Sequence, residues 1–89
     1  MALKLYTFFA EYRGGTYVSQ IRARSPAIAL QEWARKLDHN IVSGFTSKMK
    51  RELIKDAAGE NPVLLDGMRN VWCKSFNLGR HLMLVHFTE

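Results

Sequence analysis

The side chains of this sequence that could act as a nucleophile, a base or a metal ligand include a single cysteine, Cys73, and three histidines. A thiol beside an imidazole gives an activated nucleophile, because the imidazole takes the thiol proton. Cys73 and His86 belong to the two strands of an expected C-terminal hairpin, and its register decides whether they face each other. Cysteine is among the most buried residue types, which favours an inert thiol in the core. We therefore predict no catalytic residue and no enzyme.

The histidines lack the spacing of a metal site. His81 and His86 have opposite parity in one expected strand, so a regular strand directs them to opposite faces of its sheet. Asp38 and His39 stand without the clustered ligands of a zinc site. The sequence has no glycine-rich phosphate loop and no Gly-x-Ser-x-Gly or His-Glu-x-x-His motif. It thus predicts no metal, no cofactor and no small-molecule substrate.

Length and composition indicate one domain over residues 1–89. Hydrophobic residues make up 47% of the chain and charged residues 24%, a balance typical of globular proteins and not of disordered ones. The single cysteine excludes an internal disulfide and suits a reducing cytoplasm. No apolar run approaches the roughly 20 residues that a membrane-spanning helix needs. We therefore expect a soluble, cytoplasmic protein that does not enter a membrane.

The N-terminal part of the chain has the pattern of a β-hairpin. Two runs rich in aromatic and β-branched residues, Leu3–Tyr12 and Thr16–Arg24, flank Gly14-Gly15, whose glycines suit the positive φ angles of a two-residue turn. The register that follows pairs Arg13 with Thr16, Tyr12 with Tyr17, Ala10 with Ser19 and Phe8 with Ile21. One face then carries Tyr6, Phe8, Ala10, Tyr12, Tyr17, Ile21 and Ala23. The other face carries Glu11, Arg13, Gln20, Arg22 and Arg24.

Two helices are expected in the middle of the chain. Ser25-Pro26 begins the first, which extends to about Leu37 and carries Trp33 on its apolar stripe as a core anchor. The second is expected from about Ser47 to Ala58, with Thr46 or Ser47 as its cap and Gly59 as its stop.

The rest of the chain is expected to be extended. A brief strand around Val63–Leu65 precedes a second hairpin, which joins Val71–Asn77 to His81–Thr88 through a turn containing Gly79. The nearly continuous apolar run Leu82–Val85 predicts a strand in the interior of the sheet or covered on both faces.

The element order β-β-α-α-β-β predicts an α+β two-layer sandwich, in which two helices cover one face of an antiparallel sheet of four or more strands. The predicted core comprises Tyr6, Phe8, Ile21, Leu30, Trp33, Leu37, Leu53, Leu84 and one face of Val71–Phe76.

The net charge of +5 raises the question of nucleic-acid binding. Arg13, Arg22 and Arg24 share the outer face of the first hairpin, with Phe9 beside them. Arginines on a sheet can hold phosphates while an aromatic ring stacks on a base. The hairpin followed by a capped helix, together with the basic charge, resembles in outline the small α+β antitoxins and double-stranded-RNA-binding-like domains. The resemblance covers only the N-terminal part of the chain and transfers no residue roles.

Apolar residues on the outer side of the same hairpin favour a protein partner. Leu3, Leu5, Phe9 and Val18 exceed what a hydrated face needs. Tyr12 and Tyr17 beside the turn are of a type that interfaces favour, and a cross-strand pair that only stabilises the hairpin explains them equally well. The sequence predicts a small non-catalytic interaction module that forms a homodimer or binds a protein partner. The alternative is a nucleic-acid-binding or regulatory protein that uses Arg13, Arg22 and Arg24.

Overall fold

A computed structural model of the chain describes residues 3–42 and 44–89, and residues 1–2 and 43 lie outside this description. The described residues form a five-stranded antiparallel sheet and two helices. In chain order these are β1 (Lys4–Tyr12), β2 (Gly15–Ala23), α1 (Pro26–Lys36), α2 (Ser47–Gly59), β3 (Val63–Leu64), β4 (Val71–Leu78) and β5 (His81–Thr88). The predicted α+β class and the order of the elements are confirmed.

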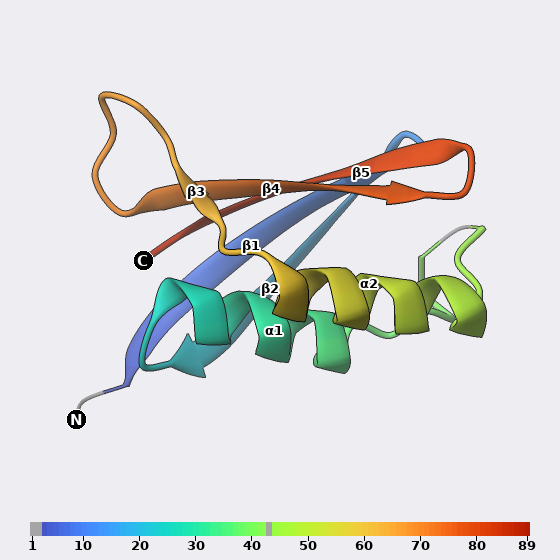
Figure 1. Cartoon of the computed structure of the whole chain (residues 1–89), viewed down its shortest axis with the longest axis horizontal. Coiled ribbons are helices and arrows are strands. Elements are labelled where there is room, and N and C mark those ends of the chain that lie inside the picture. Colours follow the sequence, from blue (N-terminus) through green and yellow to red (C-terminus); the bar gives the residue numbers. More distant parts are fainter. Residues whose placement is uncertain (1–2, 43) are drawn as a thin grey trace.

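The strand order in the sheet is β2-β1-β5-β4-β3, so β5 lies at the centre and joins the two hairpins. Figure 1 shows α1 and α2 side by side along one face of this sheet. The first helix packs on β2 and β1, and the second contacts β4. Within the described residues, no helix lies on the other face. The prediction that both helices cover one face is therefore confirmed.

The first hairpin forms, but its predicted register is wrong by two residues. The turn consists of Arg13 and Gly14, whose φ angles of 48° and 82° are both positive, as a type I′ turn requires. Tyr12 therefore pairs with Gly15, and Ala10 pairs with Tyr17. Both glycines are expected in the turn from the sequence, because a non-glycine residue rarely adopts a positive φ.

Gly15 serves a different purpose from the one predicted. A Cβ atom at this position would lie 2.8 Å from the Tyr17 hydroxyl oxygen, so a larger residue here would displace the ring that covers Gly15. A register shift of two residues keeps every side chain on the same face of the sheet. The predicted division of the hairpin into two faces is therefore correct for the strand residues.

Both helices begin at predicted caps. The Ile28 N–H donates to Ser25 Oγ at 3.3 Å, and the Met49 N–H donates to Thr46 Oγ1 at 3.2 Å. Proline follows the first cap directly, where its missing N–H has no consequence. The residues that the helices bury are Ala29, Leu30, Trp33 and Ala34 from α1, and Leu53 and Ala57 from α2.

Stacked aromatic rings join the two layers. The Phe8 ring lies 5.5 Å from the Trp33 ring of α1 and 4.4 Å from the Phe87 ring of β5, close to parallel with both. Phe87 in turn stacks on Trp72 of β4 at 5.5 Å. Trp33 is 1% exposed, which confirms that it anchors the core.

Most of the predicted core is confirmed, with one error. Tyr6, Phe8, Ile21, Leu30, Trp33 and Leu53 are buried, and Leu37 and Trp72 pack partly buried against them. Leu84 was predicted in the core and is exposed, because Met83, Val85 and Phe87 are the residues of β5 that face the helices. The uninterrupted apolar run Leu82–Val85 contains no alternation from which this parity could be read.

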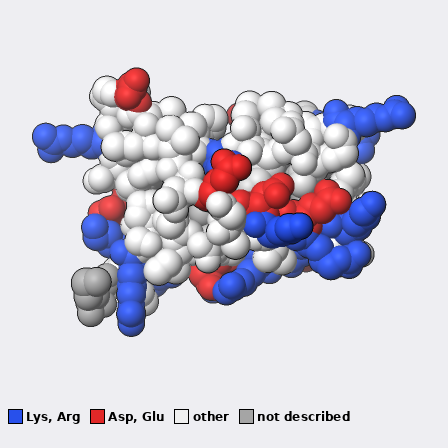
Figure 2. Space-filling model, viewed as in Figure 1, with Lys and Arg blue, Asp and Glu red and all other residues white. Residues whose placement is uncertain are grey.

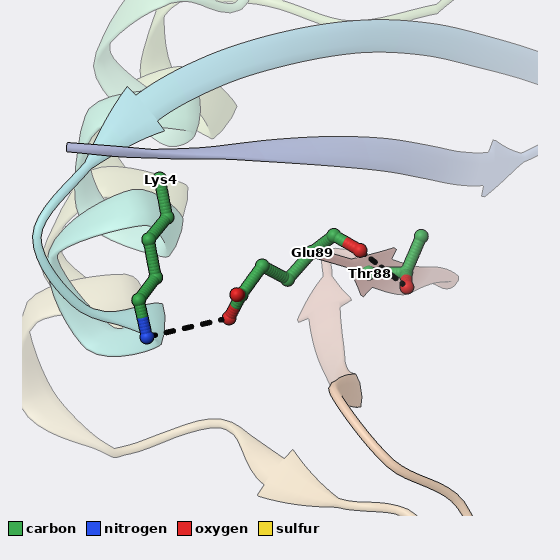
Figure 3. A network of polar contacts seen from close by, with 3 residues as sticks. All are labelled: Lys4, Thr88 and Glu89. Carbon is green, nitrogen blue, oxygen red and sulfur yellow. Dashed lines mark hydrogen bonds and ion pairs between the residues drawn. The ribbon is translucent and has the colours of Figure 1, made fainter.

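A small polar network lies beside Tyr6 at the start of β1. The Lys4 ammonium is 3.7 Å from the Glu89 carboxylate, and the Thr88 hydroxyl donates to the Glu89 carbonyl oxygen at 3.5 Å (Figure 3). Burial raises the pKa of the Tyr6 phenol above its ordinary value of 10.0, and the negative charge of Glu89 raises it further. The folded state therefore favours the neutral phenol.

Candidate partner-binding face

The face of the sheet opposite the helices is the candidate functional surface, and we call it the open face. It comprises the odd-numbered residues of β1 from Leu5 to Glu11 and of β4 from Val71 to Asn77, the even-numbered residues of β2 from Thr16 to Arg22 and of β5 from Leu82 to Thr88, and Val63 of β3. Six of its large apolar side chains are between 37% and 61% exposed: Leu5, Phe9, Val18, Val63, Leu82 and Leu84.

One row of side chains on the open face crosses the whole sheet. Phe9 of β1 pairs with Val18 of β2 on one side and with His86 of β5 on the other. The row continues through Cys73 of β4, which pairs with both His86 and Val63. Because directly paired residues of neighbouring strands touch on one face, these side chains form a continuous strip.

Charged side chains are sparse on the open face. The chain has 13 Lys and Arg residues and eight Asp and Glu residues. Of these, only Glu11 and Arg22 lie on the described strands of the open face. Figure 2 shows basic and acidic side chains crowded together over α2, at the lower right of the view. The helix layer is thus the hydrated side of the molecule, and the open face is apolar by comparison.

The three arginines of the predicted basic site lie at two ends of the hairpin. Arg22 lies on the open face opposite Leu5, and Arg24 follows the end of β2. Arg13 lies in the turn, and its guanidinium rests against Gly44. At about 3.3 Å per residue, the length of β2 separates the two ends by roughly 27 Å. The fold therefore brings Arg22 and Arg24 together and leaves Arg13 apart from them.

The three predicted aromatic site residues have three different surroundings. Phe9 lies exposed on the open face. Tyr12 is 1% exposed, meets the Phe45 ring edge-on at 5.5 Å and donates its hydroxyl hydrogen to Met49 Sδ at 3.8 Å. Tyr17 is half-buried on the helix side. Tyr17 lies directly opposite Ala10 and not opposite Tyr12, so the predicted register of this pair is wrong, and the burial of Tyr12 removes it from any partner-facing surface.

The register that the sequence left open places Cys73 directly opposite His86. Leu78 and His81 flank the two-residue turn of this hairpin, which makes Cys73 and His86 a non-hydrogen-bonded pair whose side chains lie close. Their further neighbours in the row, Phe9 and Val63, are apolar, whereas a nucleophilic thiol needs electropositive surroundings. Among the described residues, no group of three or more His, Cys, Asp and Glu side chains is placed to hold a metal ion.

Val63, Leu82 and Leu84 belong to this face although the sequence did not predict them there. The signal for the two leucines was present in β5, whose apolar run indicated burial on both sides. The prediction that this strand lies in the interior of the sheet is confirmed. Its outer side chains nevertheless stay exposed in the single chain.

Comparisons of the chain with protein-family models, with curated proteins and with solved structures gave no match. Neither helix of the described chain is long and apolar enough to cross a membrane.

Proposed function

We propose that this protein is a small, non-catalytic interaction module that forms a homodimer by packing the open faces of two copies against each other. The observation that carries the proposal is the set of exposed apolar side chains on the open face, in which Leu84 of β5 is the diagonal neighbour of Phe9 of β1 and Leu82 precedes Leu84 along β5. A central strand that is apolar on both sides is typical of a sheet covered on both faces. The helices cover one face, and a second copy supplies the other cover.

The area of the open face supports a dimer of this kind. The four long strands, spaced about 4.8 Å apart and about 27 Å long, give a face of roughly 500 Å². Two such faces bury about 1,000 Å² in total, which reaches the lower limit for a specific interface. Sheets also pack face to face readily, at a distance of about 10 Å.

The two charges of the open face support a second copy over an unrelated partner. Glu11 and Arg22 lie at opposite ends of the sheet, opposite Thr16 and Leu5 respectively, with Phe9 between them. Neither takes part in an ion pair within the described residues. In a dimer whose two-fold axis lies in the plane between the two faces and crosses the middle of β1 and β2, Glu11 of each copy would lie over Arg22 of the other. The surface is therefore complementary to itself, as an isologous interface must be.

Sedimentation velocity over a range of protein concentrations tests the proposal. We expect the wild-type protein to shift from monomer to dimer and Phe9→Glu to remain monomeric, because its carboxylate would be buried at the interface. Ile28→Glu is the matched control, since Ile28 is 44% exposed against 41% for Phe9 and lies on α1. A monomeric wild-type protein, or equal effects of the two variants, would refute the dimer.

A charge-reversal cycle tests the arrangement of the two copies. Arg22→Glu is expected to weaken the dimer about tenfold or more, because it places two carboxylates together. Adding Glu11→Arg to the same chain restores the opposite charges and should restore dimerisation. If the double variant dimerises as weakly as the single one, Glu11 and Arg22 of the two copies do not lie over each other, and the open faces pack in a different orientation.

The alternative function is nucleic-acid binding through Arg22 and Arg24. The observation that favours it is that both are exposed at the same end of β2 and form no ion pair within the described chain. Fluorescence anisotropy with labelled mixed-sequence DNA and RNA, at low and near-physiological salt, tests it. Arg22→Glu with Arg24→Glu should abolish binding, whereas Lys48→Glu with Arg51→Glu makes the same charge change on α2 and should not. Binding that both double variants weaken equally would reflect net charge alone.

A further inference from the structure

The two edges of the sheet differ in length and protection. β3 at one edge has two residues, whereas β2 at the other has nine. Natural sheets protect long edge strands with charges, prolines, bulges or a covering segment. From Thr16 to Ile21, β2 contains neither a proline nor a charged residue, and the described chain places no strand beyond it. The β2 edge is therefore free to pair with another strand.

The register of the first hairpin identifies the backbone groups at this edge. Tyr12 and Gly15 flank the two-residue turn and form a hydrogen-bonded pair, and such pairs recur at every second residue. The N–H and C=O groups of Tyr17, Ser19 and Ile21 therefore point toward β1. Those of Thr16, Val18, Gln20 and Arg22 point away from the sheet, which gives a row of donors and acceptors spaced to match an extended chain.

A hollow of about 460 Å³ lies beside this edge, between β2 and the C-terminal part of α1. Its apolar lining includes Ile21 of β2, Trp33 and Leu37 from the helix region, and Ile41 of the following loop. Ser19 points to the helix side of the sheet yet is exposed, because its small side chain leaves the space above β2 unfilled. The volume falls within the range of pockets that bind ligands.

From the edge and the hollow together, we propose that β2 binds an extended peptide, which pairs with the strand and inserts apolar side chains into the hollow. An added strand points every second side chain to the helix side of the sheet. Two large apolar side chains separated by one residue would thus enter the hollow together. The site uses the edge and the helix side of β2, so it lies apart from the open face and does not depend on the proposed dimer.

A second copy of the chain fits this site poorly. If its β2 paired with the first β2, the side chains directed at the hollow would be those of Tyr17, Ser19 and Ile21. Ile21 is already buried beneath α1 of its own chain, and Tyr17 is half-buried. Ser19 is too small to fill the space. A peptide whose apolar side chains are not already buried can pair with the outward N–H and C=O groups of β2 and also fill the hollow.

The charges around the hollow favour an acidic peptide. Lys36 lies in the lining and takes part in no ion pair of the described chain. The Asp38 carboxylate, also in the lining, accepts a hydrogen bond from the Asn40 N–H at 3.0 Å. Arg24, which follows the end of β2, adds positive charge at the far end of this edge. We therefore assign the ligand as an extended segment with alternate apolar residues flanked by Asp or Glu.

The first test selects ligands from a phage library of random linear peptides, with the full-length protein as the target. We expect the enriched peptides to carry large apolar residues two positions apart, next to an acidic residue. Amide hydrogen exchange with a synthetic version of the enriched peptide then locates its binding site. The amides of Val18 and Gln20, which point outward, should become protected, whereas those of Tyr17 and Ser19 are protected in the free protein as well.

Paired variants test the edge and the hollow separately, with fluorescence anisotropy of the labelled peptide as the readout. Gln20→Pro removes an outward N–H, and proline is tolerated at such an edge position, whereas Gln20→Ala keeps the N–H. Ser19→Phe fills the hollow, and Ser19→Ala leaves it open. We expect the first member of each pair to weaken peptide binding about tenfold or more and its control to stay within about twofold.

The dimerisation of each variant, measured by sedimentation, separates this proposal from the proposed function. Loss of peptide binding with dimerisation unchanged supports two distinct surfaces. Loss of dimerisation in Ser19→Phe would mean that the hollow is occupied by a second copy, which overturns the peptide proposal. Selection that yields no peptide able to protect Val18 and Gln20 overturns it as well, and does so without relying on any variant to fold.

Discussion

The two faces of β5 carry similarly apolar side chains in opposite surroundings. Met83, Val85 and Phe87 face the helices and are at most 1% exposed, whereas Leu82 and Leu84 on the other face are 49% and 39% exposed. Both sets of side chains belong to the same hydrogen-bonded strand, so the difference in their exposure comes from what covers each face. One apolar run therefore specifies two surfaces, the first completed within the chain and the second, by our proposal, completed by another copy.

The sharpest contrast between the two faces is expected for large aromatic residues. Trp33→Ala removes the ring that stacks on Phe8 and should lower the free energy of unfolding by about 3–5 kcal/mol. Phe9→Ala on the open face should lower it by about 0.5 kcal/mol when the protein is dilute enough to be monomeric. Urea unfolding followed by circular dichroism measures both. Equal losses would mean that the open face is packed in the monomer.

A second comparison uses neighbouring residues of β5. Met83→Ala should cost about 2–5 kcal/mol of stability, because it opens a cavity among the buried side chains under the helices. Leu84→Ala should cost far less in the monomer, about 0.5 kcal/mol, because water already reaches this side chain. Both changes are best measured in the Arg22→Glu background, at a protein concentration low enough for the monomer, so that self-association does not contribute. A Leu84 variant as unstable as the Met83 variant would contradict the observed parity of the strand.

The sequence predicted the elements of this fold well because the local signals agree with one another. Ser25-Pro26 and Thr46 mark the beginnings of the helices, and hydrogen bonds from the third residue after each cap fix them. Trp33 lies between Leu30 and Leu37 on one stripe, and the helix buries that stripe against the sheet. These features depend on residues a few positions apart, which a single sequence displays directly.

The errors came from interactions that act over longer distances. The turn lies at Arg13-Gly14 and not at the glycine pair, because the register of the two strands pairs Tyr12 with Gly15. The parity of Leu84 and the pairing of Cys73 with His86 likewise depend on which face of the second hairpin meets the helices. The strand order and the hollow beside β2 follow from how the hairpins assemble, which no local pattern encodes.

The cap of α2 provides a smaller and more local test of the covered face, which is the face of the sheet that the two helices cover. The sequence left either Thr46 or Ser47 as the cap of α2, and the structure assigns the role to Thr46. Thr46→Ala should therefore lower stability by about 1 kcal/mol, because it removes the acceptor of the Met49 N–H. Ser47→Ala should change stability by no more than about 0.5 kcal/mol. Thermal unfolding of the two variants decides between these positions, and a larger effect at Ser47 would reassign the cap.

The weakest expected effect concerns Tyr6, whose phenol lies on the covered face beside Glu89. Burial first, and the Glu89 charge second, raise the pKa of this phenol above 10.0 in the folded state. The resulting stabilisation is complete below pH 10 and is lost as the pH rises through the raised pKa, because the unfolded phenol ionises first. The free energy of unfolding, measured between about pH 9 and 11, should therefore fall more steeply for the wild-type protein than for Tyr6→Phe. Glu89→Gln should give an intermediate slope, since it removes the second cause alone. If the free energy of unfolding falls with pH equally in all three proteins, the fold does not disfavour the ionised form of the Tyr6 phenol.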